Sequence, residues 1–298
     1  MQKKLLADNI SVLGLSRSRG FMDGHVDDKY CCDILDKDRL MNILNQYKPD
    51  YIVHMASPAF IPDSYNEPQK TYSAISQGTL NILTCVRELN LSSRLLYISS
   101  ADVFGRGAIS LLTESCAYDP NNPYASAKAC SELICKQFAS SYEMDIIIAR
   151  PFNHTGPGQS PNFVCSGLAY QVAAMAGVGK QRLYTGNIDI KRDFLDVRDV
   201  VDAYACLLHQ GVSREVYNIC SGDAKLIRDI INELFRLAEI DHYEIVVDPG
   251  KVRTNDIPIR VGDNRKIKQL TGWVPKYPLE QTMRDLLFYW KENLHASK

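Results

Sequence analysis

Three residues able to carry acid–base chemistry stand in two nearby segments of the chain. Tyr124 and Lys128 are four residues apart in the run Tyr-Ala-Ser-Ala-Lys, and Ser100 lies earlier in the run Ser-Ser-Ala-Asp. Residues four apart share one face of a helix, where an ammonium group can stabilise a tyrosinate and lower its pKa from about 10. A serine hydroxyl can bind a substrate oxygen while the tyrosine exchanges a proton with it. The trio predicts carbonyl reduction or alcohol oxidation; a solvated helix face and a turn cap are the structural alternatives.

The elements that must position these residues follow from the apolar pattern. Residues 95–99 form a short apolar run that predicts a strand ending beside Ser100, and Pro123 begins a predicted helix over residues 123–142. Further strands are expected at residues 11–15, 51–55 and 144–149, and further helices at 37–46 and 68–91. Strands that are apolar on both faces and separated by helices are typical of a doubly wound parallel sheet, an α/β fold. Ligands bind such sheets at the carboxyl ends of the strands, where Ser100 stands.

The second half of the chain has a different pattern of loops, helices and strands. Residues 150–163 hold two glycines and three prolines and predict a loop. Helices are expected at residues 164–176, 226–238 and 279–294, with strands at 216–218 and 243–247. We therefore predict a Rossmann-like dinucleotide-binding domain over residues 1–150. Residues 151–298 are expected to form mainly a smaller α/β substrate lobe, with some segments returning to the main domain.

Composition excludes several classes of function. The 298 residues carry a formal charge of −1 and 45% hydrophobic residues, which gives no support to nucleic-acid or membrane-surface binding. No run of apolar residues is long enough for a membrane span, and the first residues do not resemble a signal peptide, so a cytoplasmic protein is expected. The nine cysteines form no C-x-x-C pair and the six histidines are scattered, so no metal site is predicted.

The strand-end serine followed by Tyr-x-x-x-Lys resembles the extended short-chain dehydrogenase/reductase family of nucleotide-sugar enzymes. The runs HMAS at residues 54–57 and GTLNIL at 78–83 match segments of the same family. The resemblance implies that Ser100 orients the substrate oxygen, that Tyr124 is the acid/base, and that Lys128 lowers the tyrosine pKa and holds the nicotinamide ribose. It also assigns cofactor contacts to Asp33, Met55, Ala56, Ser57 and Pro151, although Asp33 is equally suited to cap a helix.

Three longer blocks, at residues 150–159, 186–204 and 215–222, resemble one branch of that family. Its members reduce the 4-keto group of a GDP-linked 6-deoxyhexose to give GDP-D-rhamnose, which implies a GDP-linked nucleotide sugar as the substrate. By this match Asn153 contacts the diphosphate, Arg192 and Arg253 clamp its phosphates, and Asp256 accepts from the ribose. Guanidinium groups suit phosphate oxygens, which agrees with this assignment. The helices at residues 68–91 and 123–142 resemble the dimer-forming pair of the family, so a homodimer is expected.

Other activities remain open at this stage. Asp102, assigned to the substrate site, stands where the 4,6-dehydratases of the family carry a glutamate, which ranks a dehydratase below a reductase. A 4-epimerase with bound NAD is a further alternative, because the run SSADVFG at residues 99–105 resembles epimerase loops. An alternative of a different class is a catalytically silent binding or scaffold protein.

The first residues of the chain bear on which dinucleotide is bound and on how it would be held. Ser16 and Arg17 follow the predicted strand 11–15, where an NAD enzyme would present an acidic residue, so NADPH is favoured and NAD is the alternative. No Gly-x-x-Gly-x-x-Gly occurs in the sequence, and residues 1–8 resemble the helix that follows such a loop. We expect the first strand and its phosphate loop to be missing from the sheet. A misassigned start is favoured over a genuinely truncated relative or a sheet that has closed the gap.

Overall fold

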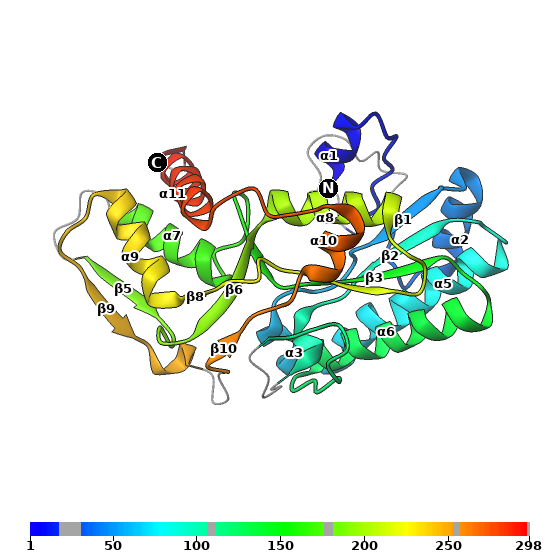
Figure 1. Ribbon diagram of the computed structural model, residues 1–298, viewed down its shortest axis with the longest axis horizontal. Coiled ribbons are helices and arrows are strands. Elements are labelled where there is room, and N and C mark those ends of the chain that lie inside the picture. Colours follow the sequence, from blue (N-terminus) through cyan, green and yellow to red (C-terminus); the bar gives the residue numbers. More distant parts are fainter. Residues whose placement is uncertain (18–30, 106–110, 176–180, 253–256, 297–298) are drawn as a thin grey trace.

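Four short strands form the central sheet of the computed structural model, which describes residues 1–17, 31–105, 111–175, 181–252 and 257–296 (Figure 1). They are β1 (Tyr51–His54), β2 (Arg94–Ile98), β3 (Ile146–Pro151) and β7 (Val216–Ile219), in the order β1-β2-β3-β7. All three neighbouring pairs are parallel, with Val53 opposite Leu96 and Leu96 opposite Ile147. The predicted parallel sheet is confirmed, with each strand within two residues of its expected bounds.

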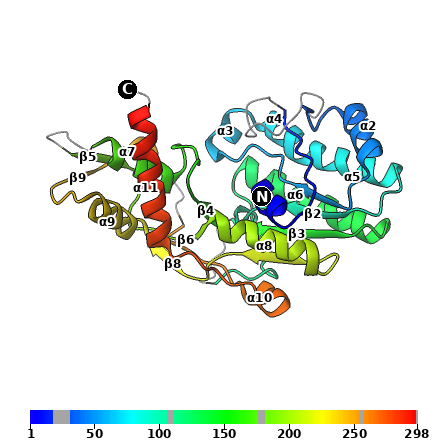
Figure 2. The ribbon, with the colours of Figure 1, turned by 90° about the horizontal axis from the view of Figure 1, so that it is seen from above.

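Helices cover both faces of this sheet (Figures 1 and 2). One face packs against α2 (Lys37–Tyr47), α5 (Gly78–Glu88) and α6 (Pro123–Ser141), and the other against α8 (Val197–Gln210), α10 (Arg265–Thr271) and the short α1 (Gln2–Ala7). Along β2 the side chains alternate, with Leu95 and Tyr97 in the first core and Leu96 and Ile98 in the second. Burial on both sides explains why the strand is apolar throughout, and it confirms a doubly wound α/β fold.

The strand expected at residues 11–15 does not form. The structure shows a single parallel bridge between Ser16 and Cys31, in which the Cys32 amide donates to the Ser16 carbonyl at 2.9 Å. Val12 packs on the core beside α8 and Leu13 on the core beside α5, so the alternation of the sequence is real. Alternating side chains allow a segment to bury residues on both of its sides. A strand also needs a neighbouring strand that hydrogen-bonds to its backbone. Within the described residues, β1 pairs with β2 alone.

The helix expected over residues 68–91 is divided. It consists of α4 (Pro68–Tyr72), a π-helical segment (Ser73–Gln77) and α5, and it is preceded by α3 (Ile61–Asn66). The π segment is held by side chains, because the Ile75 carbonyl accepts from the hydroxyls of Thr79 at 2.6 Å and Ser131 at 3.2 Å. A π segment inserts one extra residue into a helix, which shifts its faces, and apolar periodicity alone does not reveal it.

A smaller lobe lies beside the central sheet (Figure 1). Its helices are α7 (Val164–Ala174), α9 (Ile227–Ala238) and α11 (Leu279–Ala296), which pack around a shared core, and β5 (Arg182–Thr185) pairs in parallel with β9 (Glu244–Val247). The three helices and β9 agree closely with the sequence. The sequence did not predict β5, whose buried and exposed residues alternate over only four positions.

A third sheet, here called the bridging sheet, connects the two lobes. Its centre is β6 (Lys191–Asp196), which pairs in parallel with β4 (Asn153–Thr155) and β10 (Ile259–Arg260) and antiparallel with β8 (Ala224–Leu226). None of these strands was predicted: β4, β8 and β10 have only two or three residues, β4 lies within the expected loop 150–163, and β6 has charged residues at both ends. The remaining elements are the 3-10 turns Ala101–Phe104 and Pro249–Lys251.

Asp193 joins three segments of the bridging region. This fully buried carboxylate accepts from the amide and hydroxyl of Ser221 at 2.8 and 2.6 Å, and from the amides of Gly222 and Gly262 at 3.0 and 3.2 Å. The donors come from the loop after β7 and from the segment before α10. The Gly262 amide is buried and would otherwise lack an acceptor, and the same carboxylate binds Ser221 and Gly222, so one side chain determines how these segments meet.

We expect Asp193→Asn to lower the free energy of unfolding by about 3 kcal/mol, since its amide NH₂ would face buried N–H donors. Urea denaturation of the two proteins measures the difference. Asp189→Asn is the matched control, because Asp189 forms an ion pair with Arg228 in which its side chain is 69% exposed, and it should change the stability by less than about 1 kcal/mol. Equal losses in both variants would contradict the role given to Asp193.

Candidate active site

The start of α6 places two of the predicted catalytic residues at the carboxyl end of the sheet. Asn122 caps this helix by accepting from the Ala125 amide at 2.8 Å, and Pro123 occupies its first turn. Tyr124 is partly exposed, whereas Lys128, one turn further on, is only 3% exposed. The Lys128 Nζ donates to the carbonyl of Ile98, the last residue of β2, at 2.7 Å. It lies 5.9 Å from the centroid of the Tyr124 ring.

Ser100 meets this pair from the end of β2. Its hydroxyl oxygen caps the 3-10 turn by accepting from the Asp102 amide at 3.1 Å, and its hydroxyl donates to the Asp102 carboxylate at 3.4 Å. Ser100 also acts to lower the pKa of Tyr124. The turn closes at Gly105, whose φ of +56° and close approach to the Asp119 carbonyl leave no room for a side chain. The structure thus brings Ser100, Tyr124 and Lys128 together at one edge of the parallel sheet.

Burial dominates the electrostatics of the trio. It lowers the pKa of Lys128 to about 7, although the charge of Glu132 acts in the opposite direction. Burial also raises the pKa of Tyr124, with a further rise from the charge of Asp102 and a partial reduction from the neighbouring Ser100 hydroxyl. The structure therefore differs from the expectation that Lys128 brings the tyrosine pKa down. The physical reason is that the phenolate is poorly solvated and the lysine itself holds its charge weakly.

A buried ion pair beneath the trio was not assigned a role from the sequence. Glu132, four residues after Lys128, is fully buried and accepts from the Arg150 guanidinium at 2.7 and 2.9 Å. The same carboxylate accepts from the hydroxyls of Ser99 at 2.5 Å and Tyr118 at 2.8 Å. The spacing of four residues from Lys128, one helix turn, is the sequence signal that could have indicated Glu132. His54, at the end of β1, was also missed; burial lowers its pKa to about 3, and its Nε2 lies 3.0 Å from the Thr79 hydroxyl.

The residues expected to bind a cofactor divide into two groups. Met55, Ala56 and Ser57 follow β1, and Pro151 ends β3, so these four lie at the same strand ends as Ser100. Asp33 accepts from the Leu35 amide at 3.0 Å in a local turn, while Asp36 caps α2, so the cap falls on a different aspartate. Ser16 pairs with Cys31, and Arg17 is exposed beside it. The structure describes no contact between this second group and the catalytic trio.

The residues expected to bind the substrate lie in or near the bridging sheet. Asn153 is exposed on β4 and donates to the Asp193 carbonyl at 3.3 Å, and Arg192 on β6 donates to the Ile257 carbonyl at 2.6 Å. Asp102 forms an ion pair with Arg260 of β10. The expected contacts of Arg253 and Asp256 lie outside the described residues.

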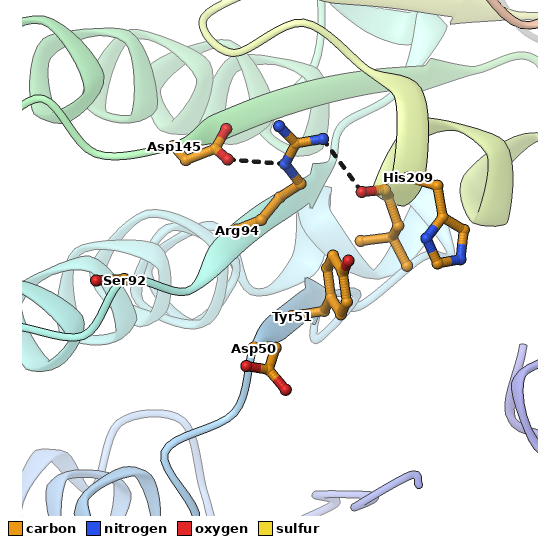
Figure 3. Close-up of a pocket in the computed structure, with 7 residues that line it drawn as sticks. Asp50, Tyr51, Ser92, Arg94, Asp145 and His209 are labelled. Atoms are coloured by element: carbon orange, nitrogen blue, oxygen red, sulfur yellow. Dashed lines mark hydrogen bonds and ion pairs between the residues drawn. The ribbon is translucent and has the colours of Figure 1, made fainter. Parts of the chain in front are cut away.

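The amino ends of the same strands carry a separate hollow of about 410 Å³. Arg94 donates there to Asp145 at 2.7 Å, and Tyr51 packs edge-on against His209 (Figure 3). Because the strands are parallel, this hollow is at the end of the sheet opposite Ser100, and it contains none of the predicted site residues. In the described parts of the chain no group of side chains could hold a metal ion, and no helix is long and apolar enough to cross a membrane.

Comparison with known proteins identifies the family. A profile described as GDP-mannose 4,6 dehydratase matches residues 18–286, which is most of the chain. The chain belongs to the GDP-mannose 4,6 dehydratase family. The resemblance to extended short-chain dehydrogenases/reductases drawn from the sequence is thereby confirmed, and the family is one of sugar-nucleotide enzymes.

Individual relatives within this group are similar over most of their length. GDP-6-deoxy-D-mannose reductase of Pseudomonas aeruginosa is 37% identical over 88% of this chain and 86% of that protein. GDP-6-deoxy-D-talose 4-dehydrogenase of Aggregatibacter actinomycetemcomitans is 32% identical over 80% of this chain and 79% of that protein. The solved structure of RMD from Pseudomonas aeruginosa complexed with NADPH is 36% identical, has a TM-score of 0.82 and covers 88% of this chain and 87% of that one.

The lowered pKa of Lys128 predicts a pH-dependent effect on stability. Between pH 7 and 10.5 the unfolded chain binds this proton more tightly than the folded protein, so burying Lys128 costs more stability as the pH falls toward 7. Lys128→Met removes that cost. Urea denaturation should show the stability of the variant, relative to the wild type, to be about 2 kcal/mol more favourable at pH 7 than at pH 9.

Lys70→Met is the control for this experiment, since Lys70 lies on α4 with its side chain 64% exposed. The stability of this variant relative to the wild type should not depend on pH over the same interval. A Lys128→Met protein whose relative stability is the same at pH 7 and pH 9 would contradict the burial of a titrating lysine.

Proposed function

We propose that this protein is an NADPH-dependent reductase that converts GDP-4-dehydro-6-deoxy-D-mannose into GDP-D-rhamnose. The observation that carries the proposal is the placement of Ser100, at the end of β2, and Tyr124, at the start of α6, beside the buried amine of Lys128. Two converging hydroxyls suit a carbonyl oxygen that becomes an alkoxide. The similarity to a GDP-6-deoxy-D-mannose reductase supports the choice of the 4-keto sugar as the substrate.

In this mechanism each residue of the trio has one task. Ser100 donates a hydrogen bond to the ketone oxygen and orients it. Tyr124, whose raised pKa keeps it a neutral phenol, gives its proton to the oxygen as the carbon is reduced, and the C=O double bond becomes C–H and O–H. The transfer is favourable because an alkoxide is a stronger base than a phenolate. Lys128, with a pKa of about 7, holds or releases a proton at neutral pH close to the tyrosine ring.

The residues at the strand ends fit the nicotinamide half of a dinucleotide. The Lys128 amine is buried with hydrogens left for a ribose, and the buried Nδ1 of His54 has no hydrogen-bond partner among the described residues. Bound NADPH would supply a hydride to the ketone carbon. Lys128, Tyr124 and Pro151 would line its nicotinamide end, and residues 55–57 would follow its path. Asp33 would meet the adenine and Ser16 and Arg17 the 2′-phosphate, which favours NADPH over NAD; the solved NADPH complex supports that order.

The nucleotide half of the substrate would lie along the bridging sheet. Asn153 and Arg192 stand on β4 and β6, strands joined to each other by Asn153 pairing with Phe194. An amide and a guanidinium on neighbouring strands suit a diphosphate. We extend the same role to Arg253 and assign Asp256 to the ribose, since both precede β10 in the sequence.

A second candidate differs only in the configuration at C4. The similarity to a GDP-6-deoxy-D-talose 4-dehydrogenase favours a hydroxyl of the opposite hand at this carbon. The same Ser100 and Tyr124 would serve, because the difference lies in which face of the ketone is presented.

One experiment separates these candidates. Purified protein is mixed with GDP-4-dehydro-6-deoxy-D-mannose and either NADPH or NADH, the absorbance at 340 nm is followed, and the product is identified by NMR. We expect faster consumption of NADPH and a product of the rhamno configuration. A talo product would establish the second candidate. Turnover of a finished sugar nucleotide without added reductant would indicate an epimerase, and no turnover with no change in NADPH fluorescence would indicate a silent binding protein.

Replacing the proposed acid should remove the activity but not the binding. We expect Tyr124→Phe to lower kcat by about 10²- to 10⁴-fold, because the alkoxide loses its proton donor, while calorimetry finds the affinity for GDP within about twofold of the wild type. Tyr142→Phe is the control at the other end of α6, where the side chain is 44% exposed, and it should keep full activity. Full activity in Tyr124→Phe would refute the mechanism.

We also propose that the protein is a homodimer held through α6. Leu133 on this helix is 55% exposed, and exposed Tyr65 and Tyr72 lie on α3 and α4, which pack against α6. An apolar group on neighbouring helices is typical of an interface between subunits. The nine cysteines, all free, agree with a cytoplasmic location.

Light scattering after size-exclusion chromatography tests the dimer. The wild type should have twice the chain mass of 33.6 kDa, and Leu133→Glu should have the mass of one chain, because a charge would be buried at the interface. Phe288→Glu is the control, since Phe288 is 61% exposed on α11 in the smaller lobe, and it should remain dimeric. A monomeric wild type would contradict the proposal.

A further inference from the structure

Arg260 reaches from the bridging sheet to the turn that follows Ser100. It lies on β10 directly opposite Arg192 of β6. Its Nη1 donates to a carboxylate oxygen of Asp102, and its Nη2 donates to the Gly105 carbonyl at 2.7 Å. The Arg260 side chain is only 12% exposed. One guanidinium therefore holds both ends of the Asp102–Gly105 turn from a different sheet.

Asp102 acts on both hydroxyls of the proposed site. Its second carboxylate oxygen accepts a long hydrogen bond from the Ser100 hydroxyl at 3.4 Å, and its negative charge acts to raise the pKa of Tyr124. The other titratable groups facing Tyr124 are Lys128 on α6, Tyr97 on β2 and Tyr204 on α8. Arg260 supplies the positive charge in direct contact with the Asp102 carboxylate.

Arg260 is the only cation among the described residues that forms an ion pair with this half-buried carboxylate, so without it the carboxylate would lose that compensation. A carboxylate in that position binds the strongest donor within reach, and charged hydrogen bonds are stronger than neutral ones. The nearest hydroxyl is that of Ser100. The long bond from Ser100 to Asp102 would then shorten and strengthen, and the Ser100 hydrogen would be less available for a substrate oxygen.

Burying the Arg260 guanidinium costs free energy. Its Nε is buried without a hydrogen-bond partner among the described residues. Buried donors in proteins are almost always satisfied, so an arginine kept with one unmet N–H is not explained by stability alone. The observation favours a role in the chemistry of the turn.

We propose that Arg260 is a positioning residue for the reduction: it neutralises Asp102 and holds the Ala101–Phe104 turn, so that the hydrogen bond from Ser100 to Asp102 stays long and weak and Ser100 can donate to the substrate oxygen instead. The inference rests on the proposed function. It adds a residue from the bridging sheet to a site otherwise built from β2 and α6, and it links the strand pair that carries Arg192 to the serine that orients the ketone.

The kinetic test compares Arg260→Met, Asp102→Asn and the double variant. Arg260→Met should lower kcat by about 10²-fold, the effect of misplacing one reacting group, with the KM for NADPH within about twofold. The double variant should recover to within about threefold of Asp102→Asn alone, because the uncompensated carboxylate is gone. Multiplying losses in the double variant would show that Arg260 acts independently of Asp102 and would overturn the proposal. An Arg260→Met enzyme with unchanged kcat would also overturn it.

Two further variants protect the test against misfolding. Arg260→Lys keeps the charge but loses the second contact, and its kcat should fall between those of the wild type and Arg260→Met. Arg265→Met is the matched control. Arg265 lies five residues after Arg260, its side chain is 71% exposed, and it forms its own ion pair with Asp263. This variant should keep the wild-type kcat. Equal losses in Arg265→Met and Arg260→Met would mean a general effect on folding and would overturn the proposal.

Hydrogen exchange provides a measurement that needs no substrate. Arg260→Met should increase exchange at the amides of Val103 and Gly105, which close the turn, while exchange in β3 remains unchanged. If the wild type does not reduce the 4-keto sugar, the proposed function fails, and this experiment still decides whether Arg260 holds the turn. Unchanged exchange at both amides would overturn the inference whatever the activity.

Discussion

The buried carboxylate of Glu132 is the interaction on which the rest of the site depends. It accepts hydrogen bonds from Ser99 at the end of β2, from Arg150 at the end of β3 and from Tyr118 in the intervening loop. Glu132 itself lies on α6, so these bonds fix the helix against two strand ends. Removing one partner of such a buried pair usually costs about 3–5 kcal/mol, because the other charge is left without compensation. These bonds therefore help to determine how far Ser100, which follows β2, lies from Tyr124 on α6.

The bridging sheet provides a second level of organisation. Asp193 of β6 binds the loop after β7 and the segment before α10, while Arg260 extends from β10 to the Asp102 turn. Close to these, the Leu112 amide donates to the Val261 carbonyl and the Asp263 amide donates to the Leu112 carbonyl, each at 2.9 Å. Segments distant in sequence therefore support the turn after Ser100. A substrate bound along the bridging sheet would touch the same framework that holds the catalytic residues.

Sequence alone predicted the parts of this protein that depend on local pattern. The strands of the central sheet are apolar on both faces, and the Tyr-x-x-x-Lys spacing needs one helix turn, so both were recovered from the residues. What sequence missed depends on partners: residues 11–15 alternate correctly yet find no ladder, and the polar strand β10 exists because β6 lies beside it. The raised pKa of Tyr124 was likewise unforeseen, because burial and the Asp102 charge arise only when three elements converge.

The π-helical segment between α4 and α5 has a consequence for how this protein tolerates change. Successive residues of a helix are rotated by about 100°, so the inserted residue turns α5 by that amount relative to α4. Thr71 and Ile82 are both buried in this arrangement. A one-residue deletion between them would straighten the helix and rotate one of these side chains toward solvent. A substitution at the exposed Ser73 would leave the relative rotation of α4 and α5 unchanged. The number of residues in this segment is therefore constrained more strictly than their identity.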